Sequence, residues 1–308
     1  MNKRRYVHIF FLDGVGLGKS DPAVNPFVTA NMPYLSDLLG GRDWYLQGNG
    51  RISNARASLI ATDANLDMQG RPQSATGQAT ILTGRNVPQL VGEHYGPKPN
   101  PAVAEVIGQG SLFQDVADAG GKAALITPYP QGYFDAINSG RRLYSAVPLA
   151  VTNAGWPLFG ADELRAGKAV SPGFTGQGWH DMLGYEDIPI LRLFEAGQQI
   201  AALARQYDLS FFEHWPSDRS GHRGPVGDAV KHLEMIDTAA GGLLDAWDDQ
   251  AGLLIITSDH GNIEEKNHRQ HTRNPVPTIL VGANHADLAE DITNLADIAP
   301  VVRKVLAL

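Results

Sequence analysis

Carboxylate and imidazole side chains follow several apolar runs of this sequence. They stand after VHIFFL, LSFFEHWPS and LLIITS, and in the later block QHTRNPVP. In chain order they are Asp13, Asp218, His222, Asp259, His260 and His271. Each alone has an ordinary structural explanation, since Asp before Gly forms turns and histidine often satisfies a hydrogen bond. Gathered at strand ends, such groups would repel one another and lose hydration unless cations compensated them, so the combination predicts a metal site.

The composition restricts the kind of metal. There is no cysteine, which leaves nitrogen and oxygen ligands. A mixed set of this kind suits zinc or manganese, whereas calcium prefers cages of oxygen alone. Two imidazoles and one carboxylate, in Asp218, His222 and His271, also match mononuclear iron oxygenases, but such enzymes do not need the further acidic cluster around Asp259.

A hydroxyl-bearing block, PQSATGQ, leads into the apolar stretch ATILTG. If that stretch is a helix, the backbone N–H groups at its start point toward an anion. Ser74 is the candidate nucleophile, provided that a metal lowers its pKa, and Thr76 or Thr80 are alternatives. The ordinary explanation is a helix N-cap, the usual role of Ser or Thr at this position.

The elements that must position these groups alternate along the chain. Apolar runs predict strands at 7–12, 123–126, 209–212, 253–257 and 278–281. Spacing and end signals predict helices at 112–119, 195–207, 229–247 and from 297 onward. This alternation predicts an α/β fold with a mostly parallel sheet between helices, which binds ligands beyond the carboxyl ends of its strands. The glycines after Asp13 lack the spacing of a dinucleotide-binding loop.

The segment from about 136 to 189 breaks this alternation, being rich in glycine, proline and aromatic residues. Within a single domain spanning 1–308, it predicts an inserted lid or cap, and a surface layer or dimer contact is equally compatible. The candidate substrate contacts in this segment are Arg141, Arg142 and His180. The ordinary explanation of each is a solvated surface residue without a role in binding.

Length and charge narrow the classes of partner. With 308 residues and 43% hydrophobic composition, the chain can bury a large core. The net charge is -8 and the sequence has no long basic run, so it does not predict a nucleic-acid-binding surface. The basic start Lys3-Arg4-Arg5 precedes an apolar run, Tyr6 to Leu12, that is short and strand-like, and no stretch approaches transmembrane length. We therefore expect a cytoplasmic protein without a membrane partner.

Five motifs occur in the same order as in a known family of enzymes. LDG, PQSATGQATILTGR, DRSGH, SDHGN and HTRNPVP resemble the metalloenzyme core of the alkaline phosphatase superfamily, shared by cofactor-independent phosphoglycerate mutase, phosphopentomutase and alkaline phosphatase. The resemblance implies two divalent ions. Its ligand sets are Asp13, Ser74, Asp259 and His260 for the first metal, and Asp218, His222 and His271 for the second. It also implies that Ser74 attacks phosphorus in line, giving a phosphoserine that water or a second hydroxyl resolves.

The departures from the family favour hydrolysis. This chain has no room for the large inserted domain of those mutases, and Ala75 and Gln78 replace the Glu and His of their PNSEVGH block. No phosphopentomutase-like cap sequence is visible. We therefore predict a phosphatase or phosphodiesterase acting on a small phosphorylated substrate, with phosphomutase or phosphotransferase activity as the alternative. The sequence is also compatible with a homo-oligomer.

Two other classes fit less well. A sulfatase-like hydrolase would need a Cys/Ser-x-Pro-x-Arg context, which is not present around Ser74. A non-catalytic metal-binding protein would be expected to have lost ligands, yet all seven positions carry suitable side chains.

Overall fold

The central sheet contains all the strands found among the described residues. The computed structural model describes residues 5–308 apart from 42, 47 and 49. Within that part of the chain, the strand order is β2-β3-β7-β6-β1-β5-β4. The strands are β1 (Tyr6–Leu12), β2 (Arg51–Ser53), β3 (Ala57–Thr62), β4 (Ala123–Leu125), β5 (Leu209–His214), β6 (Gly252–Thr257) and β7 (Val276–Val281).

Most strands of this sheet share one direction. β1 is parallel to both of its neighbours, β5 and β6, and β4 is parallel to β5. β7 runs antiparallel to β6 and to β3, so β3 points the same way as the central strands. Only β2 and β7 are reversed among the strands described above. The predicted α/β fold with a mostly parallel sheet is confirmed.

The central strands are buried and mostly apolar because helices cover both faces of the sheet. Every residue of β1 is buried. Val7, Ile9 and Phe11 pack into the core on one face, whereas Phe10 and Leu12 pack into the core on the other. This two-residue period means that a strand between two cores appears in the sequence as an uninterrupted apolar run.

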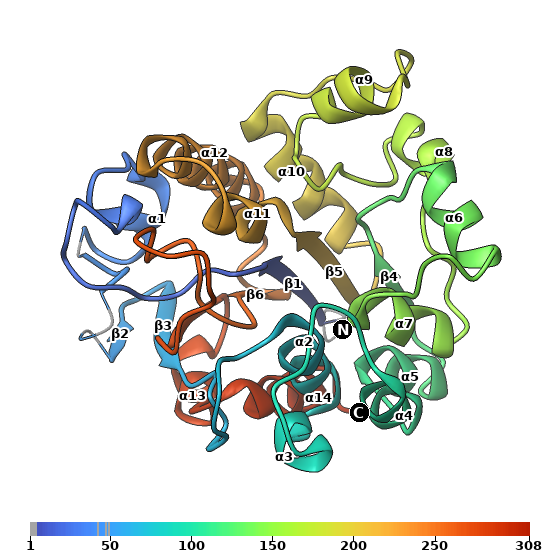
Figure 1. Ribbon diagram of the computed structural model, residues 1–308, viewed down its shortest axis with the longest axis horizontal. Helices are drawn as coiled ribbons and strands as arrows, with labels where there is room; N and C mark the ends of the chain where they lie inside the picture. The colour runs from blue at the N-terminus through green and yellow to red at the C-terminus, as the bar shows by residue number, and fades with distance from the viewer. Residues whose placement is uncertain (1–4, 42, 47, 49) are drawn as a thin grey trace.

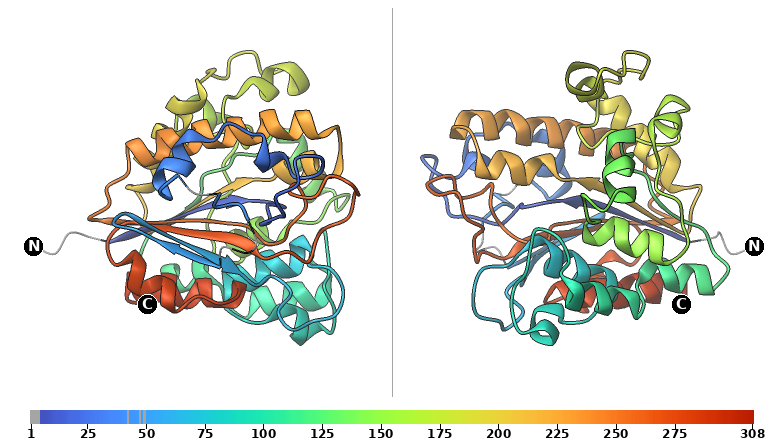
Figure 2. Two further views of the ribbon diagram at one scale, coloured as in Figure 1. Left: turned by 90° about the vertical axis from the view of Figure 1, so that its left-hand side faces the viewer. Right: turned by 45° about the vertical axis from the view of Figure 1, so that its right-hand side comes forward.

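Helices form a layer on each side of the sheet (Figures 1 and 2). One layer contains α1 (Pro33–Leu38), α10 (Leu193–Ala204) and α12 (Val226–Asp245). The other contains α2 (Ser74–Thr83), α4 (Pro101–Gly108), α5 (Leu112–Asp118), α7 (Ala146–Asn153), α13 (His285–Glu290) and α14 (Ile298–Leu306). The apolar stripe predicted for α12 is confirmed, since Ala229, Leu233 and Ile236 are all buried against its neighbours.

The segment 136–189 divides between the main core and the periphery. Its helix α7 is buried in the same core as α2 and α5. α8 (Ala161–Arg165) and α9 (Gln177–Leu183) instead surround a small separate cluster that contains Leu164, Trp179 and Ile188. With α6 (Gln131–Asn138), they lie along the outer edge beyond β4 and α10 (Figure 1). A lid function for this segment stays a prediction.

The remaining short helices are η1 (Pro26–Val28), α3 (Val87–Val91), α11 (Pro216–His222) and η3 (Leu295–Asp297). No helix in the described part of the chain has both the length and the apolar character required to cross a membrane. The apolar run after the basic start is strand β1, while Lys3 and Arg4 lie outside the described residues.

Candidate metal centre

The predicted ligands meet because their strands are neighbours. β6, β1 and β5 lie side by side and run parallel, so their carboxyl ends reach the same edge of the sheet. Asp13 directly follows β1, Asp218 lies in α11 just after β5, and Asp259 follows β6. The backbone N–H of Asp13 still donates to the carbonyl of His214, 3.1 Å away, which fixes this residue at the end of the ladder.

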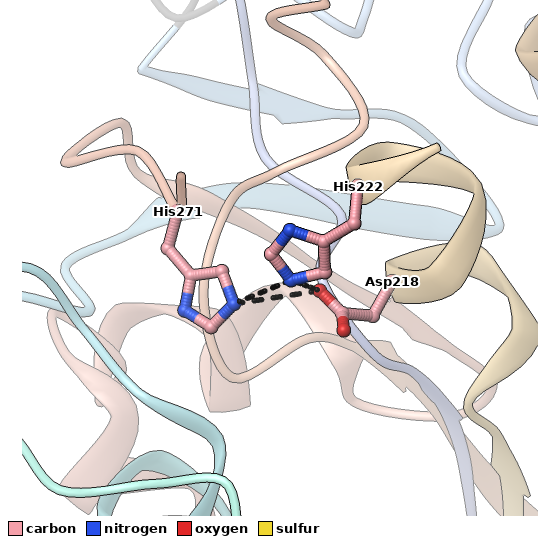
Figure 3. A group of neighbouring side chains, drawn as sticks. All are labelled: Asp218, His222 and His271. Atoms are coloured by element: carbon pink, nitrogen blue, oxygen red, sulfur yellow. Dashed lines mark hydrogen bonds and ion pairs between the residues drawn. The ribbon is translucent and has the colours of Figure 1, made fainter. Parts of the chain in front are cut away.

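Three side chains form what we call the rim group: Asp218, His222 and His271 (Figure 3). Asp218 Oδ1 lies 3.3 Å from His222 Nε2 and 3.5 Å from His271 Nε2. The two Nε2 atoms are 3.2 Å apart. Asp218 and His222 stand four residues apart on α11, a spacing that places both on one helix face. His271 approaches from the loop between β6 and β7.

The hydrogen bonds of the Nδ1 atoms show which tautomer each rim-group histidine adopts. Nδ1 of His222 lies 2.8 Å from the carbonyl of Arg269, and Nδ1 of His271 lies 2.9 Å from the carbonyl of Pro72. Because a carbonyl oxygen only accepts, both Nδ1 atoms carry hydrogen, and in the neutral imidazoles both Nε2 atoms present lone pairs. When both imidazoles are neutral, two nitrogen lone pairs and one carboxylate oxygen thus converge, and a divalent cation fits that arrangement.

Protonation competes with a cation in the rim group. Burial alone would raise the pKa of Asp218, but hydrogen bonding to His222 and nearby positive charge bring that pKa down to about 2. The hydrogen bond to Asp218 raises the pKa of His222, whereas burial lowers the pKa of His271 to about 4. A cation entering the rim group would therefore compete with a proton for His222.

A second set, the buried group, comprises Asp13, Ser74, Asp259 and His260. His260 Nε2 lies 3.4 Å from Asp13 Oδ1, 3.7 Å from Asp259 Oδ2 and 3.0 Å from Ser74 Oγ. Asp13 Oδ1 is buried and has no hydrogen-bond partner among the described residues. Burial, followed by the charge of Asp259, raises the pKa of Asp13; burial and the charge of Asp218 raise that of Asp259 to about 7. Nearby carboxylates that resist ionisation in this way fit a site for a cation.

Asp218 connects the two groups. Its ligand atom lies within 4.8 Å of those of His222 and His271, and also within 4.8 Å of those of Asp13 and His260. The resemblance had assigned Asp218 to the second metal alone. The imidazole rings of His260 and His271 also stack, with centroids 3.7 Å apart. The two ligand sets thus form one continuous centre.

Ser74 is the hydroxyl that faces this centre. It is the first residue of α2, whose N-cap position is occupied by Gln73 without a side-chain capping bond. The Thr76 hydroxyl contacts backbone atoms of Tyr95 instead, and that of Thr80 donates to the carbonyl of Thr76. Of these three hydroxyls, only the one on Ser74 lies against a group that could hold a metal.

The three candidate substrate contacts lie apart from the ligands. Arg141 is exposed and donates to the hydroxyl of Ser139, and His180 pairs with the carbonyl of Ile188. The guanidinium of Arg142 lies 4.9 Å from the centroid of the Tyr133 ring. Among the described residues, none of the three forms a hydrogen bond or ion pair with a proposed metal ligand. Their role with substrate stays a prediction.

One supporting residue not singled out in the sequence is Lys266. Its ammonium donates to the carbonyls of Ser220, of Gly221 at 2.8 Å and of Arg223 at 2.9 Å. These three acceptors use all three donors of the ammonium at the C-terminal end of α11, where a positive charge is favourable. Lys266 therefore ties the loop after β6 to the helix that carries Asp218.

Two further residues of that loop support the centre. Asn262 donates its side-chain amide to Asp218 Oδ1 at 2.6 Å. The buried carboxylate of Glu264 accepts from the backbone N–H groups of Gly16 and Asn262 and from the side chain of Asn274. Asn262 stands in the SDHGN block, which was a sequence signal, whereas the contact between Glu264 and Gly16 joins residues that are distant in sequence and gave none.

Comparison with known proteins finds a family model that matches the C-terminal part of the chain. Residues 194–308 match the family model described as the Metalloenzyme superfamily. Over these residues, the chain is similar to these metalloenzymes. The matched region contains the rim group together with Asp259 and His260, whereas Asp13 and Ser74 lie before it. The predicted resemblance to metalloenzymes of the alkaline phosphatase superfamily is therefore confirmed.

Curated relatives cover only part of the chain. The 2,3-bisphosphoglycerate-independent phosphoglycerate mutase of Thiobacillus denitrificans is 34% identical over 137 residues, which are 42% of this chain and 26% of the mutase. The protein of the same name from Pseudomonas putida is 36% identical over 124 residues, 38% of this chain and 23% of the relative. This chain thus spans about a quarter of the length of the relatives that it matches.

Solved structures extend the likeness of fold to the whole chain. The PH0037 protein of Pyrococcus horikoshii has a TM-score of 0.56 and 15% identity, covering 100% of this chain and 98% of the other. Alkaline phosphatase from the Antarctic bacterium TAB5 has a TM-score of 0.53 and 13% identity, covering 100% and 99%. The predicted alkaline-phosphatase-like fold is confirmed by this likeness.

Proposed function

We propose that this protein is a metal-dependent phosphoryl-transfer enzyme that uses Ser74 as its nucleophile on a small phosphate ester. The observation that carries the proposal is the position of Ser74 Oγ, 3.0 Å from His260 Nε2 and inside the cluster of acids and imidazoles. The rim and buried groups would hold two divalent cations, zinc or manganese, which supply positive charge to the phosphate and to the serine oxygen.

The chain itself contributes position and enclosure. Helix α2 begins at Ser74, so the hydroxyl is held by a regular element. Asp259 and His260 are fully buried, which keeps water from the side of the site that adjoins the sheet. In the proposed first step, Ser74 Oγ gives up its proton and forms a bond to phosphorus while the bond from phosphorus to the ester oxygen breaks, and that oxygen takes up a proton as the alcohol leaves. A second hydroxyl, or water, then takes the phosphoryl group from the serine.

Transfer to a second hydroxyl is the better-supported outcome. The sequence favoured hydrolysis, but the curated relatives that match are named as mutases. We therefore place phosphomutase or phosphotransferase activity first. Hydrolysis as a phosphatase or phosphodiesterase remains the second candidate because the rim group is open to solvent, with the side chains of His222 and Asp218 33% and 22% exposed. Water could reach a phosphoserine from that side.

The fate of the phosphoryl group tests the proposal. Protein loaded with manganese or zinc is incubated with phosphoglycerate, with a generic aryl phosphate and with its diester, and both inorganic phosphate and transferred phosphate are measured. We expect phosphate on a new hydroxyl in excess of free phosphate, and a phosphoserine at residue 74 by mass spectrometry. Free phosphate alone would move the assignment to a hydrolase.

A pair of variants tests the nucleophile. Ser74→Ala should keep metal but lose covalent phosphorylation and turnover, whereas Thr76→Val, on the same turn of α2, should keep both. Turnover by Ser74→Ala at the wild-type rate would remove Ser74 from the mechanism. Elemental analysis of the same preparations distinguishes zinc from manganese. A cytoplasmic location and a homo-oligomer stay predictions.

A further inference from the structure

One buried side chain near the centre belongs to neither ligand group. Gln78 lies four residues after Ser74 on α2, so both project from the same side of the helix. Its side-chain amide nitrogen lies 3.3 Å from Asp13 Oδ2 and 3.1 Å from Asp259 Oδ2. Only 3% of Gln78 is exposed, and its carbonyl oxygen Oε1 has no hydrogen-bond partner among the described residues.

The two N–H donors of this amide are directed at two different carboxylates. The amide nitrogen carries two hydrogens, one for each carboxylate, so Gln78 can restrain the rotation of both carboxylates at once. With Oδ2 of Asp13 held in this way, its Oδ1 remains free of hydrogen bonds and lies 3.4 Å from His260 Nε2. The oxygen that a cation would need is the one left available.

The chemistry of the amide matters as much as its position. In the described part of the chain, neither Asp13 nor Asp259 forms an ion pair with a lysine or arginine, and the imidazole of His260 lies close to both carboxylates. A lysine in place of Gln78 would neutralise charge that would otherwise attract a dication. A neutral amide orients the carboxylates and leaves their negative charge in place.

We propose that Gln78 is a positioning residue that sets the orientation of Asp13 and Asp259 and so gives the buried group its affinity for a divalent cation. The inference rests on the proposed metal centre. It also makes α2 a shared support, since one turn of this helix carries the nucleophile and the next carries the side chain that orients the carboxylates. Among the described residues, Gln78 forms no hydrogen bond with a member of the rim group, so the affinity of that group should be independent of this residue.

Metal binding by the stripped protein tests the inference. The full chain is freed of metal with a chelator and titrated with Mn²⁺ by calorimetry, beside Gln78→Met, which has similar size but no donor. The wild type should show two binding events. In Gln78→Met one event should weaken by roughly 10- to 100-fold, the range found when partners of metal ligands are removed. The other should be unchanged.

Two further variants separate positioning from packing. Thr83→Val removes a buried polar group from the same helix, where it donates to the carbonyl of Ala79, and should keep both events. Gln78→His retains a ring N–H donor and should recover part of the lost affinity. The thermal unfolding midpoint of each metal-free variant is measured in parallel, because a packing role would lower that midpoint without separating the two events.

The failures are distinguishable. Two wild-type events in Gln78→Met would overturn the positioning role while leaving the metal centre intact. No Mn²⁺ or Zn²⁺ binding by the wild type would overturn the metal centre and this inference together. If Gln78→Met does not fold, Gln78→His decides. A neutral imidazole has one N–H instead of two, so weakening of one event with the other unchanged would support the positioning role, and equal weakening of both events would contradict it.

Discussion

The rim group and the buried group have similar ligands but are held in place by different parts of the molecule. In the rim group, main-chain carbonyls from two loops orient the imidazoles, and a third of the side chain of His222 is exposed. In the buried group, Asp13 and Asp259 follow central strands and share the amide of Gln78. We therefore expect mutations in the loops to change metal binding by the rim group, and mutations near the sheet to change metal binding by the buried group.

The largest effect should come from the residue that connects them. Asp218→Ala removes a rim-group ligand atom that also lies within 4.8 Å of the ligand atoms of Asp13 and His260, so binding of both cations should weaken and turnover should fall by orders of magnitude. Elemental analysis and a phosphoryl-transfer assay check this, with circular dichroism as the test of folding. Retention of two tightly bound cations would show that Asp218 does not bridge the groups.

A smaller change should separate the groups. His222→Ala removes an imidazole that belongs to the rim group alone, so the protein should bind one cation tightly instead of two. The fold should tolerate this change because His222 is partly exposed. Calorimetric titration of the metal-free protein measures the stoichiometry. Equal weakening of both events would break the distinction between the groups.

Lys266→Met should act on the rim group without removing a ligand. Loss of the ammonium leaves three carbonyls at the end of α11 without their donor, and His222 at that end should become less well placed. Removing a group that supports a metal ligand typically weakens binding at least about tenfold. Lys304→Met is the matched control, since Lys304 is exposed and pairs with Asp291 far along the chain. A similar loss in both variants would indicate a general effect of charge.

The smallest effect on the centre should come from Asp237→Ala. This carboxylate of α12 accepts the backbone N–H groups of Tyr34 and Leu35 in the first turn of α1. Losing a cap of this kind should lower the free energy of unfolding by about 1–2 kcal/mol. Denaturant unfolding measures that loss, and metal stoichiometry should stay at the wild-type value. A change in stoichiometry would mean that the centre depends on the outer helix layer.

Much of the fold could be predicted because its central strands lie between two cores. Runs such as 253–257 and 209–212 are apolar on both faces, and they became β6 and β5 with small changes at their ends. β2 and β3 were not predicted. β2 is three residues long, and both pair antiparallel at the sheet edge, outside the strand-helix alternation on which the prediction relied.

The sequence predicted which residues form the site, but not how these residues contact one another. Residue type and strand ends identify the acids and imidazoles, and the structure gathers them. The position of Asp218 between both groups depends on distances that no spacing encodes. Gln78 appeared in the sequence only as a departure from a motif. Lys266 gave no signal because its carbonyl acceptors belong to the backbone, which any sequence supplies.

The placement of α6, α8 and α9 beyond the edge strand β4 has an evolutionary consequence. The centre is built on β6, β1 and β5, in the middle of the sheet, and on α2 beneath them. Insertions or exchanges in the outer segment can therefore accumulate without moving the ligands. Descendants of one ancestral chain could adopt new substrates by replacing that segment while inheriting the same reaction chemistry.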